Sequence, residues 1–187
     1  IFISSNPPRS AEQTVALRLH AIGAVNGFKM FLPDRFNSET YIDDSTKIRI
    51  NEAGFFVVFS TSPLSTIVKQ EIEYAYSVLR DASKIIVIYS KHVGKNLKGD
   101  IVNHFTSVEF DPLTEGSDIV INKIFNAIFQ KQQQDLTQKI QEATNAKAKK
   151  ELKKQQEETT RLQNALLAVL GIGVGLMILN EILNNNK

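Results

Sequence analysis

Glu71 is the residue of this sequence whose type and position are best suited to chemistry. It lies in the stretch Thr66-Ile-Val-Lys-Gln-Glu71-Ile-Glu-Tyr-Ala-Tyr76, which follows the apolar run Phe55–Phe59 through a short linker rich in serine and threonine. The pattern predicts a buried strand, a loop and a helix with a carboxylate in its first two turns. Ligands of open parallel α/β sheets bind at the carboxyl ends of the strands. A carboxylate there could act as a nucleophile, a general base or a ribose anchor; the alternative is an ordinary surface glutamate.

Five apolar runs alternate with helical patterns along the first two thirds of the chain. They predict strands at Ile1–Ile3, Phe28–Leu32, Phe55–Phe59, Lys84–Tyr89 and Phe105–Phe110. Between them, we expect a helix starting at Ser10, a shorter one capped by Ser45, and the helix that carries Glu71. Alternation of this kind is typical of βαβ units, so the expected fold is α/β, a flavodoxin-like three-layer arrangement around a parallel sheet.

The amino-acid composition excludes several kinds of catalytic and binding site. The 187 residues include no cysteine, which excludes disulfides, thiolate nucleophiles and Cys-bound zinc. A formal net charge of +2 gives no reason to expect nucleic acid as a partner. The histidines His20, His92 and His104 lack metal-ligand spacing, and no Walker or G-x-G-x-x-G loop is present, so no metal site and no phosphate cradle of that type are expected.

The amino-acid composition changes after the first domain, which we place at residues 1–130. Residues 131–163 consist mostly of Gln, Lys, Glu, Thr and Ala and predict a long, charged helical stalk. Residues 164–187 are apolar, and their core at 165–183 is close to the roughly 20 residues that span a bilayer. We therefore expect a cytoplasmic protein anchored to the inner face of the membrane by residues 165–183. The alternative is a helix buried in the core of an oligomer.

Three segments of residues 1–130 resemble a TIR domain. Phe2-Ile-Ser-Ser5 resembles the first-strand motif of the family, and Gly27-Phe-Lys-Met-Phe31, with a loop opening on Asp34, is similar to its second strand and BB loop. The stretch from Ser65 to Ala75 resembles the Ser-x-Trp-x-x-x-Glu helix of enzymatic members, with Ile67 where many members have tryptophan.

A second resemblance involves some of the same residues. Leu32-Pro-Asp-Arg35 and Glu71-Ile-Glu-Tyr-Ala-Tyr76 are similar to nucleoside 2-deoxyribosyltransferases, although the Asp-x-Gly-Thr element of those enzymes is replaced by Ser60-Thr-Ser-Pro-Leu-Ser-Thr66. Both families attack an N-glycosidic bond at the sugar C1 atom with a carboxylate, here Glu71.

The TIR resemblance implies an enzyme that cleaves the nicotinamide–ribose bond of NAD⁺, which is its substrate, with no further cofactor. Glu71 would be the catalytic residue. The implied substrate-binding residues are Ser4, Ser5, Asn6, Arg9, Phe31, Asp34 and Ile67. For the polar ones among them, the alternative is a turn-forming or solvated role.

The same resemblance implies activation by self-association through the TIR domain and the C-terminal helices, in antiphage defence by NAD⁺ depletion or by a cyclic nucleotide signal. The alternative from another class is a non-catalytic TIR adaptor anchored by its tail.

Overall fold

A computed structural model of the chain describes residues 1–6, 11–34, 40–90, 105–111, 114–143 and 146–169. The chain divides into two units, Ile1–Ala127 and Ile128–Lys187, and each is described by itself. The first unit is an α/β arrangement around a parallel sheet, and the second is helical. Arg9 and residues 170–187 of the expected anchor lie outside the described residues.

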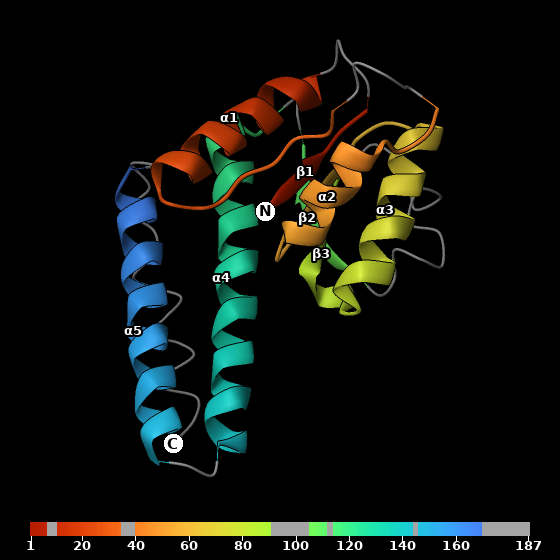
Figure 1. The fold of residues 1–187 in the computed structure, drawn as a ribbon. Coiled ribbons are helices and arrows are strands. Elements are labelled where there is room, and N and C mark those ends of the chain that lie inside the picture. Colours follow the sequence, from red (N-terminus) through yellow and green to blue (C-terminus); the bar gives the residue numbers. More distant parts are fainter. Residues whose placement is uncertain (7–10, 35–39, 91–104, 112–113, 144–145, 170–187) are drawn as a thin grey trace. The chain divides into compact units, whose positions relative to one another are not determined.

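A four-stranded parallel sheet forms the centre of the first unit (Figure 1). Its strands are β1 (Phe2–Ser4), β2 (Phe56–Ser60), β3 (Ile85–Ser90) and β4 (Thr106–Phe110), and they lie side by side in that order. In register, Ser4 pairs with Val58, and Ser60 pairs with Tyr89. The central strands are buried on both faces, as continuous apolar runs predict for parallel sheets.

The predicted strand Phe28–Leu32 is reduced to one bridge, in which Phe31 pairs in parallel with Phe2. Two backbone hydrogen bonds hold it, from Phe31 N–H to the Ile1 carbonyl (2.8 Å) and from Ile3 N–H to the Phe31 carbonyl (2.9 Å). The pairing stops there because the next residue that would donate toward β1 is Pro33, which has no N–H. The Leu32 carbonyl, which points away from β1, accepts a hydrogen bond from Arg49 (2.8 Å). From β1 the chain therefore passes to Phe31 on one side and then to β2 on the other.

Helices cover both faces of the sheet (Figure 1). On one face lie α2 (Asp44–Glu52) and α3 (Thr66–Leu79), whose Ile50, Ile67 and Ile72 share a buried core with Phe2 and Val58. On the other face lie α1 (Ala11–Val25) and the beginning of α4 (Ser117–Glu142), joined by an ion pair between Arg18 and Asp118 at 2.7 Å. A short 3₁₀ helix, η1 (Ala82–Lys84), precedes β3.

The N-cap of α2 is Asp43, so the prediction of Ser45 as the cap is wrong. The Asp43 carboxylate accepts a hydrogen bond from Thr46 N–H at 2.7 Å, which satisfies one of the free donors of the first turn. Ser45 lies inside the helix and donates its hydroxyl to Asp43 instead. The start of α3 at Thr66 and the positive φ of Gly27 after α1 agree with the sequence pattern.

The described residues of the second unit form a helical hairpin, so the long helical stalk predicted for residues 131–163 is divided between two helices. Helix α4 ends at Glu142, and α5 (Ala146–Val169) runs back beside it (Figure 1). Gln133 donates to the Gln156 carbonyl (3.3 Å) and to the Thr160 hydroxyl (2.9 Å), while Gln156 donates to Thr137 (3.4 Å). This pairing is antiparallel because the partner numbers fall as the α4 numbers rise.

None of the helices in the part of the chain that the structure describes is both long and apolar enough to cross a bilayer.

The hairpin can be tested by cross-linking, because the chain has no cysteine of its own. We expect the variant Thr137→Cys/Gln156→Cys to form an intramolecular link in high yield with a short bismaleimide. In one continuous helix these positions would be roughly 28 Å apart, beyond the reach of such a reagent. The readout is mobility under denaturing conditions; Thr137→Cys alone, the control, gives no intramolecular product. A double variant that links only between molecules would contradict the hairpin.

Candidate functional site

Glu71 lies on the sheet-facing side of α3 and is fully buried. Its carboxylate accepts a hydrogen bond from the hydroxyl of Ser4, the last residue of β1, which is equally buried. The apolar residues Ile67, Val68, Ile72 and Ala75 occupy the same face of the helix. A carboxylate is costly to bury in such surroundings unless it is hydrogen-bonded, so the Ser4 hydroxyl is a condition for placing it there.

Asn6 ties the end of β1 to the loop between β2 and α3. Its side-chain amide donates to the Ser62 hydroxyl (2.8 Å) and the Pro63 carbonyl (3.2 Å), and its oxygen accepts from Ser65 N–H (2.9 Å). Ser65 is the N-cap residue of α3. Asn6 therefore fixes the position at which the Glu71 helix begins.

Glu12 holds the same loop from the other face of the sheet, a role that the sequence analysis missed. This residue of the first turn of α1 is 4% exposed, and its Oε1 accepts hydrogen bonds from both the backbone N–H (2.9 Å) and the hydroxyl of Thr61. Thr61 directly follows β2. The sequence feature that could have pointed to this role is a glutamate in the first turn of the helix that follows β1.

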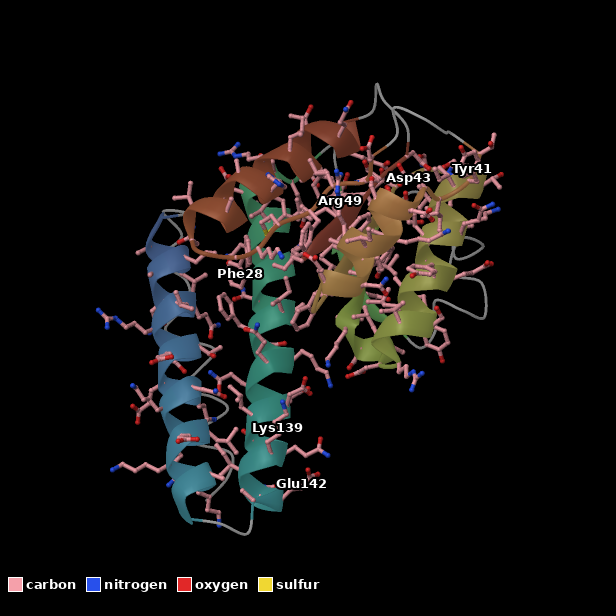
Figure 2. All side chains as sticks on the ribbon, in the orientation of Figure 1. Phe28, Tyr41, Asp43, Arg49, Lys139 and Glu142 are labelled. Carbon is pink, nitrogen blue, oxygen red and sulfur yellow. The ribbon has the colours of Figure 1, made fainter. Side chains whose placement is uncertain are left out.

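Asp34 is held by α2. Its backbone N–H donates to the Thr46 hydroxyl (3.1 Å), its carboxylate accepts from Ser45 (3.4 Å), and Arg49 lies 3.7 Å from it. Figure 2 shows Asp43 at the beginning of α2 and Arg49 further along the same helix. The loop that opens at Asp34 thus starts from a position fixed by contacts with α2.

The remaining predicted substrate-binding residues occupy different surroundings. Ser5 is half-buried directly after β1. Phe31 is partly buried beside the core of the α2–α3 face, with the Lys29 ammonium 5.2 Å from its ring centre. Ile67 is 2% exposed and belongs to the core itself, one helical turn before Glu71. The structure thus brings Ser4 and Glu71 into direct contact and places Asn6 on the adjoining loop.

These contacts converge on the carboxyl ends of β1 and β2, the two strands between which the chain changes direction across the sheet. In open α/β sheets, this is the place where ligands bind. Within the described ranges, no group of three or more His, Cys, Asp or Glu side chains is arranged to hold a metal ion. No protein-family model matches this chain, and a search of curated proteins gives no match either.

We predict that Asn6→Ala lowers the free energy of unfolding by about 1–3 kcal/mol, because it leaves Ser65 N–H and the Pro63 carbonyl without their partner. Asn6→Asp keeps the acceptor for Ser65 N–H but loses both donors, so its unfolding midpoint should lie between those of wild type and the alanine variant. Urea denaturation followed by circular dichroism measures both. An unchanged unfolding midpoint for Asn6→Ala would show that the hydrogen bonds of Asn6 contribute nothing to stability.

A second prediction concerns the pH dependence of the α2 cap. Burial alone would raise the pKa of Asp43, but hydrogen bonds from Thr46 and Ser45 and the charge of Arg49 lower the pKa below its ordinary value. A lowered folded-state pKa favours the native state above the ordinary aspartate pKa, and this contribution disappears as pH falls through the folded-state pKa. Asp43→Ala should therefore lower the free energy of unfolding by about 1 kcal/mol near pH 7 and by progressively less in acid.

Thermal unfolding of wild type and Asp43→Ala between neutral and strongly acidic pH measures this difference. The matched control is Asp44→Ala, since the neighbouring Asp44 is highly exposed and pairs with Lys47 three residues on. Asp44→Ala should change the free energy of unfolding by no more than about 0.5 kcal/mol at every pH. Equal pH profiles for the two variants would contradict the assignment of Asp43 as the cap.

Proposed function

We propose that this chain is a TIR-like NAD⁺ glycohydrolase or cyclase that cleaves the nicotinamide–ribose bond with Glu71 as its catalytic carboxylate. The observation that carries the proposal is the fully buried Glu71, held by the Ser4 hydroxyl at the carboxyl ends of β1 and β2. The four parallel strands, with Phe31 bridged to the outer side of β1, are compatible with the order of a flavodoxin-like sheet.

The chemistry fits a carboxylate in this position. Departure of nicotinamide leaves positive charge on the ribose C1 atom, and a neighbouring carboxylate stabilises that charge or forms a bond to the carbon, as in glycosidases. A low-dielectric environment strengthens this interaction, since charges attract each other more strongly where water is excluded.

The surrounding polar residues would hold the rest of the dinucleotide. Ser5 and Asn6 follow Ser4 at the end of β1, where backbone and side-chain donors suit ribose hydroxyls and phosphate oxygens. Asp34, at the base of the next loop, would orient ribose hydroxyls, and Phe31 and Ile67 would supply apolar surface near the reacting sugar. Arg9 is proposed as the partner of the pyrophosphate.

Self-association is the proposed means of activation, with the TIR-like domain and the C-terminal helices as the contact regions. The proposed setting is defence against phage, where clustering would trigger NAD⁺ depletion or synthesis of a cyclic nucleotide.

The decisive test is nicotinamide release from NAD⁺ by the full chain, free and fused to an obligate oligomer. We expect release in the clustered form and a loss of about a hundredfold or more in Glu71→Gln, because the amide cannot stabilise a cation at C1 as a carboxylate does. Ser4→Ala should also lower the turnover rate, since it removes the donor that orients Glu71.

The matched control is Glu73→Gln, which changes an exposed glutamate on the same helix and should leave the rate unchanged. If the clustered wild type releases no nicotinamide, the chain is not an NAD⁺ glycohydrolase and the adaptor alternative takes its place. If Glu71→Gln releases nicotinamide as fast as wild type, another group performs the reaction.

A further inference from the structure

In the part of the chain that the structure describes, one carboxylate oxygen of Glu12 has no hydrogen-bond partner. Among the described residues, three buried side-chain oxygens lack a hydrogen-bond partner, and two of them, Glu12 Oε2 and Ser65 Oγ, belong to residues attached to the loop between β2 and α3. The third, Asp118 Oδ1, forms an ion pair with Arg18. The unsatisfied oxygens therefore concentrate at the edge of the sheet where Glu71 lies.

A buried oxygen without a hydrogen-bond partner lowers the stability of the folded state. A carboxylate offers about four acceptor positions on two oxygens, and here both donors from Thr61 go to Oε1 alone. Leaving a buried acceptor unsatisfied costs free energy, so each case calls for an explanation. The attachment to Thr61 itself needs no charge, since a glutamine oxygen would accept the same two hydrogen bonds.

The position of Glu12 indicates what the second oxygen serves. Thr61 directly follows β2, and Ser4 ends β1, the neighbouring strand. Glu12 reaches this edge from the α1 face of the sheet, and Glu71 reaches it from the α3 face. Two buried carboxylates thus approach the ends of two adjacent strands from opposite faces, at the point where the chain changes direction across the sheet.

We propose that Glu12 is a ligand-binding residue whose Oε2 accepts a hydrogen bond from a hydroxyl of the ribose bound at this edge. Its Oε1 keeps the loop in place through Thr61, so one side chain both positions the loop and binds the sugar. Ser65 Oγ, the other unsatisfied oxygen, is a hydroxyl that can donate to the same ligand as well as accept from it. The identification of the ligand as a ribose rests on the proposed function. The observation that Glu12 Oε2 has no partner among the described residues is independent of that function.

The test measures binding of ADP-ribose to the full chain by calorimetry, with Glu12→Gln as the main variant. Glutamine keeps the oxygen that accepts from Thr61 but places an NH₂ donor where Oε2 was. We expect its affinity for ADP-ribose to fall about tenfold or more, with a melting temperature within about 3 °C of wild type. Glu52→Gln, which removes an exposed charge paired with Lys29, is the control for the change in net charge and should bind as wild type does.

A second measurement changes the ligand as well as the protein. Wild type should bind analogues of ADP-ribose that lack one hydroxyl of the terminal ribose more weakly, and Glu12→Gln should not discriminate against the analogue whose missing hydroxyl contacts Glu12. If wild-type affinity is unchanged for every analogue that lacks a ribose hydroxyl, or if Glu12→Gln binds ADP-ribose as tightly as wild type, then Glu12 only positions the loop and the proposal is overturned.

The outcomes separate this proposal from the enzymatic one. Nicotinamide release together with full ADP-ribose affinity in Glu12→Gln would retain the glycohydrolase and reject the role of Glu12. Binding that depends on Glu12, without nicotinamide release by wild type, would retain the ribose site and reject the enzyme. Absence of both would reject the two together.

Discussion

The hydrogen bond between Ser4 and Glu71 is the contact on which the geometry of the site depends. It requires the side chain of the last residue of β1 to point toward α3, and side chains along a strand alternate between faces. Phe2 meets this requirement together with Ser4, because it belongs to the core on that face. A shift of β1 by one residue would turn Ser4 away and place the apolar Ile3 against the carboxylate. The stacked pair of Phe2 and Phe56, whose ring centres are 5.4 Å apart, opposes such a shift.

The carboxylate occupies a place where a purely structural sequence would have an apolar residue. Ile67, Glu71 and Ala75 are spaced four residues apart, so they follow one another along the buried stripe of α3. An aliphatic side chain at position 71 would join this stripe without needing a donor. Removing a buried polar pair in favour of well-packed apolar groups is often neutral or stabilising. The presence of glutamate at this point is therefore better explained by what it does than by what it contributes to stability.

Local patterns predicted most of the elements, and the exceptions are due to contacts between distant residues. Both Asp43 and Ser45 are good N-caps, and the choice depends on the network that Asp34, Thr46 and Arg49 form across the loop. Arg49 also donates to the carbonyl of Leu32, 17 residues earlier, and so ties α2 to the segment that follows Phe31. The reversal between α4 and α5 occurs in a segment without Gly or Pro, where periodicity alone predicts a continuous helix.

The candidate site was predictable only in part for the same reason. Glu71 could be recognised because its helix follows a strongly apolar strand, so one short stretch contains both its position and its chemistry. Glu12 is 49 residues from Thr61, and no local pattern predicts that pair. In the sequence it is simply one acidic residue in the first turn of a helix, where such residues are common because they favour the helix dipole.

Glu71 and the β2–α3 loop are coupled through β1. Ser4 and Asn6 are two residues apart, and they contact Glu71 and the loop respectively. A displacement of the end of β1 would therefore move the donor of the carboxylate and the anchor of the α3 N-terminus together. Glu12 limits the same displacement from the opposite face by holding Thr61, at the start of the loop. A ligand that contacts the end of β1 would consequently act on Glu71 through short, direct connections.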